Sequence, residues 1–128
     1  MTKTEAIIRS ILGPIGTDIR PLACAVDITA ELIFKKKIPI DEVRVTKDIY
    51  PIVAKQLGKS ASSISKKIER LSNLCWDAGD VEVLKKIIGK RLYDIRAPRD
   101  MLFYLAYYTY LDMSFFEAMI KKTSSIPR

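Results

Sequence analysis

Apolar residues recur three or four positions apart along almost the whole chain, and glycine or proline interrupts each run. This spacing places apolar side chains on one face of a helix, whereas a half-buried strand would require strict alternation. The breaks fall at Gly13-Pro14, Ile38-Pro39, Gly58 and Gly79. The 128 residues are enough for one domain with one core. The pattern therefore predicts an all-α fold, a compact bundle of about six helices. We expect a single domain over residues 1–128, with a frayed tail at about 123–128.

The composition argues against several kinds of chemistry. The chain has no histidine, so it lacks the commonest general base and the commonest metal ligand. Cys24 and Cys75 lie far apart within apolar helical patterns and form no CxxC pair, and we expect them to be buried free thiols. No arrangement of lysines or carboxylates indicates catalysis. We therefore expect neither an enzyme nor a protein that holds a metal or a cofactor.

The charge favours an anionic partner. Lysine and arginine together outnumber aspartate and glutamate by 22 to 15, which gives a net charge of +7. Such a balance suits a nucleic acid or an anionic membrane surface. The N-terminal MTKTEAIIRS carries Glu5 and no long apolar stretch, so no signal peptide is expected. Asp112 and Glu117 interrupt the most apolar segment and argue against a membrane span. We expect a cytoplasmic protein without membrane contact.

Residues from about 60 to 78 form the predicted helix that is most informative about function. On a helical wheel, Ile64, Ile68, Leu71 and Cys75 lie on one side, which must face the core. The other side carries hydroxyl, amide, carboxylate and cationic groups, which can contact base edges or phosphates. The candidate DNA-binding residues are Ser62, Ser63, Ser65, Lys66, Glu69, Arg70 and Asn73.

The segment before this helix has the spacing of a helix-turn-helix unit. Ala54 would let the two helices touch, Gly58 would adopt a positive φ at the turn, and Ile64 would anchor the second helix on the first. An ordinary amphipathic helix with a solvated face is the alternative interpretation, and the pattern alone leaves both open.

Further cations surround the predicted unit. Candidate phosphate contacts are Lys59, Lys67, Lys90, Arg91 and Arg96, the last three in a predicted loop over residues 89–97. Cations in such positions can bind the DNA backbone. A merely solvated surface is the alternative.

Residues 45–80, VTKDIYPIVAKQLGKSASSISKKIERLSNLCWDAGD, resemble a known family. The matching residues are Thr46, Lys47, Tyr50, Pro51, Ala54, Lys55, Ala61, Ser62, Ile64, Ile68, Trp76 and Gly79. The family is the C-terminal DNA-binding domain of stage-zero sporulation protein A, the sporulation response regulator of Firmicutes. The likeness extends upstream through Ile15-Gly16 and downstream to Pro98 and Phe103, over about residues 5–111.

The resemblance implies an all-helical, sequence-specific transcription regulator related to sporulation. Its expected partner is double-stranded DNA, with a sigma factor of RNA polymerase as a further candidate. The resemblance also implies that the second helix of the unit, about residues 60–78, enters the major groove. Carried over by position, Ser63, Ser65, Lys66 and Arg70 would face that groove. The family usually has arginine at the position of Ser63 and glutamate at that of Ser65, so its DNA sequence preference is not carried over. No acidic pocket for phosphorylation is evident, so we expect DNA binding without phosphorelay control.

The same two serines support an alternative function. Serine cannot make the bidentate contact by which arginine recognises guanine. A chain that has kept the fold but lost base reading would be a protein-interaction module, which binds another regulator or itself.

The last predicted helix, from Pro98 to about Lys122, is apolar or aromatic nearly all round. Its rings are Phe103, Tyr104, Tyr107, Tyr108, Tyr110, Phe115 and Phe116. A helix that is apolar on all sides must be covered on all sides, and this predicts a homodimer through the C-terminal aromatic helix. The alternative is a monomer in which residues 112–122 fold back and cover their own domain.

Overall fold

The computed structural model of the chain describes residues 1–89 and 100–124, the side chains of 122–124 excepted. Its α-helices are α1 (Lys3–Leu12), α2 (Arg20–Ala30), α3 (Tyr50–Leu57), α4 (Ala61–Ala78), α5 (Val81–Ile88), α6 (Asp100–Leu111) and α7 (Phe115–Ser124). Two π-helical segments, η1 (Glu31–Lys35) and η3 (Val45–Ile49), and a 3-10 turn, η2 (Ile40–Glu42), lie between α2 and α3. Within these ranges there is no strand. The predicted all-α bundle is confirmed, with seven α-helices over the described ranges instead of about six.

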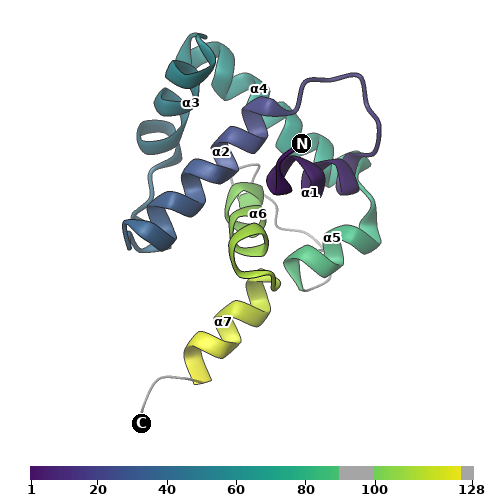
Figure 1. The fold of residues 1–128 in the computed structure, drawn as a ribbon, viewed down its shortest axis with the longest axis vertical. Coiled ribbons are helices and arrows are strands. Elements are labelled where there is room, and N and C mark those ends of the chain that lie inside the picture. Colours follow the sequence, from purple (N-terminus) through teal and green to yellow (C-terminus); the bar gives the residue numbers. More distant parts are fainter. Residues whose placement is uncertain (90–99, 125–128) are drawn as a thin grey trace.

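Helix α2 organises the bundle. It packs against α1, α3, α4 and α6, and α6 also contacts α1, α5 and α7. The buried side chains form one hydrophobic cluster, to which Leu22 of α2, Ile64 of α4 and Leu102 of α6 contribute fully buried members. Figure 1 shows α3 and α4 at one end of the molecule and α7 extending from the opposite end. The α3–α4 pair and α7 therefore lie at opposite ends of the molecule, whereas Tyr104 of α6 packs edge-on against Trp76 of α4 with ring centroids 6.1 Å apart.

Side-chain caps define where two of these helices begin. The Thr2 hydroxyl accepts the Glu5 backbone N–H, and the Glu5 carboxylate accepts the Thr2 N–H, each at 3.1 Å, so both groups of a capping box are present before α1. Asp80 Oδ1 accepts the backbone N–H groups of Glu82 and Val83 at the start of α5. These caps satisfy donors that have no partner within the helix.

The junction between α4 and α5 rests directly on α1. The backbone N–H of Asp80 donates to the carbonyl of Ile11 at 2.9 Å. A Cβ at Gly79 would lie 2.3 Å from the Cys75 carbonyl oxygen and 2.6 Å from Ile11 Cγ2. Only glycine therefore allows this approach, and the contact fixes the C-terminal end of α4 relative to α1.

The C-terminal segment differs from its prediction. A single helix from Pro98 to about Lys122 is wrong, because Asp112 has a left-handed backbone with φ of 56° and separates α6 from α7. Ser114 begins the new helix, since its Oγ accepts the Glu117 backbone N–H at 3.1 Å. Pro98 and the predicted loop at 89–97, apart from Gly89, lie outside the described residues. Helix α7 continues to Ser124, and the rest of the predicted frayed tail also lies outside them.

The aromatic rings of this segment are largely covered by the chain itself. Tyr107 packs edge-on against Phe34 of η1 and against Phe115 of α7, with ring centroids 5.0 and 4.9 Å apart. Phe34 also stacks on Tyr110 at 4.3 Å. Covering these rings does not require a second subunit. Tyr110 and Ile120 keep exposed fractions of 49% and 68%.

Two further expectations concern the thiols and the membrane. Both cysteines are free; Cys75 is buried as predicted, whereas Cys24 is only partly buried. In the described part of the chain, no helix combines the length and apolar character needed to cross a bilayer.

Candidate nucleic-acid interface

Helices α3 and α4 form two packed helices joined by a tight turn. Gly58 ends α3 in the left-handed conformation, with φ of 66° and ψ of 37°, and the next N–H, that of Lys59, donates back to the Ala54 carbonyl at 2.9 Å. Ser60 then caps α4 by accepting the Ser63 N–H at 3.2 Å. Ala54 and Ile64 are buried, with exposed fractions of 5% and 0%. Each of the three positions singled out in the sequence thus has the environment that was predicted for it.

The faces of α4 divide as the helical wheel indicates. Ile64, Ile68, Leu71 and Cys75 are buried. Ser62, Lys66, Arg70 and Asn73 are exposed, Ser63, Ser65 and Glu69 are partly exposed, and the nearby Lys59 and Lys67 are exposed. The structure therefore places these nine candidate residues on or beside one helix, with their side chains off the core side.

The side chains of two candidate residues, Ser65 and Glu69, make hydrogen bonds within the chain. The hydroxyl of Ser65 donates to the Ser62 carbonyl at 3.0 Å. The Tyr50 hydroxyl of α3 donates to Glu69 Oε2 at 3.1 Å. The carboxylate of Glu69 therefore links α4 to α3 as well as facing outward, whereas Lys66 and Arg70 extend from the exposed side of the helix.

The cations proposed for phosphate contacts are only partly placed. Lys90, Arg91 and Arg96 lie outside the described residues. Lys67 lines a hollow of about 130 Å³ together with Thr17, Asp18, Arg70 and Leu71. Thr17 and Asp18 belong to the connection between α1 and α2, which sequence reasoning missed. Ile15-Gly16 in the family resemblance was the only signal near them, because contacts between segments this far apart in sequence depend on the tertiary fold.

Asp18, whose pKa is strongly lowered, lies beside the α4 face. Arg20 Nη2 donates to its Oδ2 at 2.8 Å, and Arg20 Nε and the Arg20 backbone N–H each donate to its Oδ1 at 3.0 Å. These bonds, chiefly those from the Arg20 side chain, lower the pKa of Asp18 to about 2, and the charge of Lys67 lowers it further. Asp18 is therefore ionised at neutral pH.

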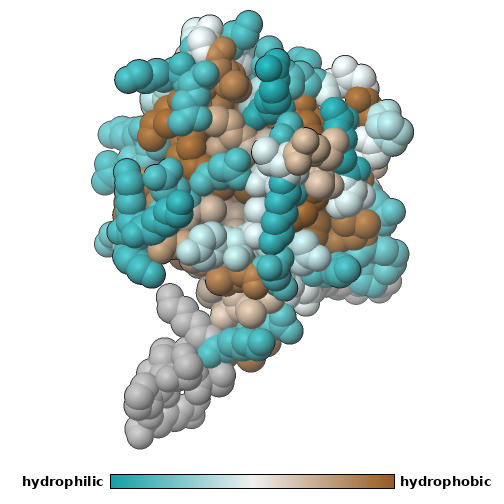
Figure 2. Space-filling model, in the orientation of Figure 1, coloured by the Kyte–Doolittle hydropathy of each residue, from teal (hydrophilic) through white to brown (hydrophobic). Residues whose placement is uncertain are grey.

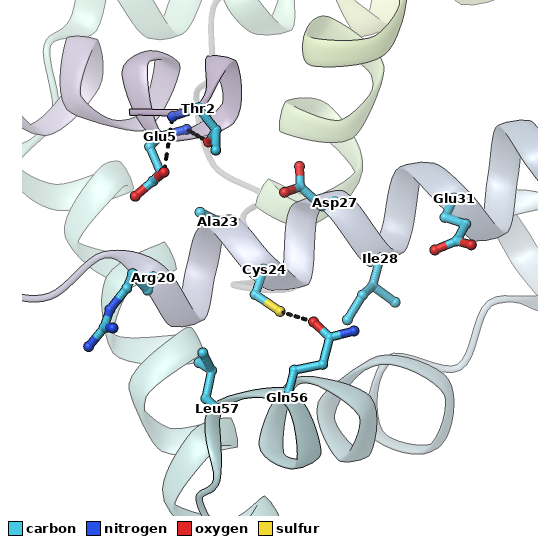
Figure 3. A pocket seen from close by; sticks show the side chains of 10 residues that line it. All are labelled: Thr2, Glu5, Arg20, Ala23, Cys24, Asp27, Ile28, Glu31, Gln56 and Leu57. Carbon is cyan, nitrogen blue, oxygen red and sulfur yellow. Dashed lines mark hydrogen bonds between the residues drawn. The ribbon is translucent and has the colours of Figure 1, made fainter.

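A second hollow has the opposite character. It occupies about 330 Å³ between α1, α2 and α3 (Figure 3), and Glu5, Asp27 and Glu31 bring three carboxylates to its lining. Cys24 Sγ donates to Gln56 Oε1 at 3.0 Å inside it, and burial raises the pKa of this thiol, with a smaller contribution from Asp27. An acidic hollow would repel phosphate, so it is a poor candidate for nucleic-acid contact.

A third hollow, of about 590 Å³, is lined by Arg9 and by Met1, Gly13, Pro14, Ile15 and Gly16, and none of these residues belongs to α4. Figure 2 shows hydrophilic side chains over most of one face, with several separate hydrophobic areas between them. Among the described residues, no group of three or more potential ligands is placed to hold a metal ion. The exposed polar and cationic side of α4 is therefore the best candidate for an interface with a polyanion.

A comparison with protein families covers the same region of the chain. A family model described as sporulation initiation factor Spo0A C terminal matches residues 30–106, which is more than half of the chain. The match includes all of α3 and α4. No solved structure matches the chain.

Proposed function

We propose that this chain, which belongs to the family of sporulation initiation factor Spo0A C-terminal domains, binds duplex DNA sequence-specifically through α4. The family consists of non-catalytic, DNA-binding domains of transcription regulators. The exposed side of α4, with Lys66 and Arg70 at its middle, is the observation that supports the proposal most directly. An α-helix fits the major groove of B-DNA, where base edges can be distinguished. The α3–α4 pair would act as the helix-turn-helix unit of a single domain.

The side chains on α4 suggest how contacts divide between bases and backbone. Lys66, Arg70 and Asn73 are long enough to reach base edges, and both cations can recognise guanine. Ser62 and the partly exposed Ser63 are short, so they allow the start of the helix to come close to the DNA. Lys59 and Lys67 flank this region and would contact phosphates, which fix the register without reading sequence.

Selection of duplexes from a random library by the purified chain tests this proposal. We expect enrichment of a defined motif, and an affinity that falls steeply as salt rises, since each phosphate contact releases counterions. Absence of binding even at low salt would overturn the proposal. Salt-dependent binding without any enriched motif would overturn the sequence-specific part and leave backbone binding only.

The finer biological assignments are also proposals. We propose action in the cytoplasm, in transcription related to sporulation, because these fit the family. A sigma factor of RNA polymerase is the further partner that we propose. Co-purification of a sigma factor with the chain on its selected DNA, compared with the same DNA alone, tests this partner.

A homodimer is proposed through the exposed end of the C-terminal region. Ile120 of α7 is 68% exposed and Tyr110 of α6 is 49% exposed, and α7 extends away from the bundle (Figure 1). Two copies would present two copies of α4, which raises affinity for paired sites. Sedimentation at micromolar concentration should show a dimer that Ile120→Asp dissociates. A monomeric wild-type chain would contradict it.

The protein-interaction module remains the second candidate function. The Ser65 and Glu69 hydrogen bonds within the chain favour it, because they occupy polar groups that base reading would use. A salt titration of duplex binding distinguishes the two functions, since a module without DNA binding shows no salt-dependent complex.

A further inference from the structure

The connection between α1 and α2 brings a negative charge to the edge of the proposed DNA-binding face. Thr17 and Asp18 share a hollow of about 130 Å³ with Lys67 and Arg70 of α4. Both cations belong to the side of α4 that is proposed to contact DNA. One carboxylate thus lies beside Arg70 and beside Lys67, the cation that would otherwise be available to a phosphate.

Asp18 is held in this position by its neighbour Arg20. Three hydrogen-bonding groups of Arg20, two from the guanidinium and one from the backbone, converge on the Asp18 carboxylate at 2.8 to 3.0 Å. The Asp18 side chain nevertheless keeps an exposed fraction of 51%, and that of Arg20 keeps 70%. The carboxylate is therefore fixed by its partner and still open to an approaching anion.

A phosphate that enters the hollow would meet both attraction and repulsion. Lys67 and the Thr17 hydroxyl can donate to phosphate oxygens, whereas the Asp18 carboxylate can only accept. The Asp18 carboxylate and the phosphate are both negative and repel each other, and this repulsion is strongest at low salt. The Asp18 carboxylate also forms an ion pair with Arg20, so the charge of this further cation is already paired.

We propose that Asp18 competes with a DNA backbone phosphate for Lys67. This competition weakens the binding of α4 to DNA without altering base recognition. This inference rests on the proposed function, because it assigns a role at the same interface. Phosphate contacts position a protein on DNA and base contacts specify sequence. Asp18 should therefore lower specific and non-specific affinity together and leave their ratio unchanged.

Asp18→Asn tests the proposal by removing the charge while keeping the shape. We expect it to bind a short random-sequence duplex several-fold more tightly than wild type at low salt. The plot of log affinity against log salt should steepen by up to about 0.9, the contribution of one added phosphate contact. In a Lys67→Ala background the gain from Asp18→Asn should shrink, because the cation that the carboxylate opposes is gone.

The matched control is Asp41→Asn. Asp41 is exposed in η2, beyond the far end of α2 and η1 from Asp18, and its replacement changes the net charge equally. Equal effects of the two variants, or an unchanged salt slope for Asp18→Asn, would overturn the inference while the wild-type DNA binding stood. If the wild-type chain binds no duplex at low salt, the proposed function fails and this inference with it.

A second variant guards against loss of structure. Asp18→Ser keeps an acceptor for the Arg20 backbone N–H, and thermal unfolding monitored by circular dichroism compares both variants with wild type. A folded Asp18→Ser chain should also bind more tightly than wild type, and wild-type affinity in that folded chain would overturn the proposal.

Discussion

The α3–α4 pair and the α6–α7 pair are both adjacent helices joined by a short connection, but they divide their side chains differently between core and solvent. In α4, Ile64 and Ile68 are buried on one side, and Lys66 and Asn73 are exposed on the other. Helix α6 buries Leu105 and Tyr107, which lie on nearly opposite sides of its axis. The difference arises because α6 is surrounded by α1, α2, α5 and α7. A helix with one apolar face reveals its orientation in the sequence, whereas a helix that is apolar all round does not.

The largest effects should come from truncating buried side chains, and they should separate the two regions. Leu105→Ala should lower the free energy of unfolding by about 2–5 kcal/mol and Tyr107→Ala by a similar amount, since both sides of α6 face neighbours. In α4, Ile68→Ala should cost about 2–5 kcal/mol, but Asn73→Ala should stay within about 0.5 kcal/mol. Chemical denaturation of the four variants measures these changes.

This comparison contains its own control, because Asn73 lies opposite Ile64 on α4 and Tyr107 lies nearly opposite Leu105 on α6. If Tyr107→Ala were as mild as Asn73→Ala, α6 would have an uncovered side, and the case for a partner subunit on that side would become stronger.

The next largest effect concerns DNA, and it should be confined to the α3–α4 region. Lys66→Ala combined with Arg70→Ala should weaken binding to the selected duplex by about 1–3 kcal/mol for each base edge that the variant can no longer bind. Fluorescence anisotropy at fixed salt measures this weakening. Lys35→Ala combined with Lys36→Ala is the matched control, since it removes the same charge from the exposed end of η1. Equal weakening by the two double variants would mean that net charge, and not the α4 face, controls binding.

A smaller effect should follow from changing the turn between α3 and α4. Gly58 has φ of 66°, and a Cβ there would meet no atom within 4 Å. Gly58→Ala should therefore destabilise the fold through backbone strain alone, by about 1–2 kcal/mol. Gly58→Asn should cost less, because asparagine tolerates the left-handed region better than alanine. Thermal unfolding compares the variants, and a similar loss of stability for both would show that the strain lies elsewhere.

The same contrast shows what the sequence could and could not reveal. The orientation of α4, the left-handed Gly58 and the Asp80 cap were predictable, because each depends on residues close together in the chain. The main prediction, a single helix to about Lys122, had no break between α6 and α7, since Asp112 is neither glycine nor proline; only the monomer alternative, with residues 112–122 folded back, implied one. Ser114, three residues before Glu117, carries the signature of a helix start and was the available signal.

The hollow that joins Asp18 to Lys67 had no such local signal. Its residues come from the α1–α2 connection and from the middle of α4, and only the packing of the bundle brings them together. The Tyr50–Glu69 hydrogen bond is of the same kind. The sequence therefore predicted the DNA-binding candidates of a single helix, but it did not predict the groups that surround them.

The smallest effect that we expect concerns the pH dependence contributed by Asp18. Its pKa is about 2 in the folded chain, against an ordinary value of 3.8, chiefly because the Arg20 side chain donates to it. A carboxylate with a lowered pKa adds stability that is present above the pKa of the unfolded chain and is lost as the pH falls toward the folded-state pKa. This contribution should therefore disappear between about pH 4 and pH 2. Because the pair is exposed, solvent screening should keep it below about 1 kcal/mol.

Denaturant titrations of wild type, Asp18→Asn and Asp41→Asn at several values between pH 7 and pH 2 measure this contribution. Asp18→Asn should be slightly less stable than wild type at pH 7, and the difference should vanish toward pH 2, where the wild-type carboxylate becomes protonated. Asp41→Asn should follow wild type throughout. A constant deficit for Asp18→Asn at every pH would instead mean that the substitution damages packing. The same variant is expected to bind DNA more tightly at neutral pH, so a loss of stability with a gain of affinity would separate the role of Asp18 in the fold from its role at the α4 face.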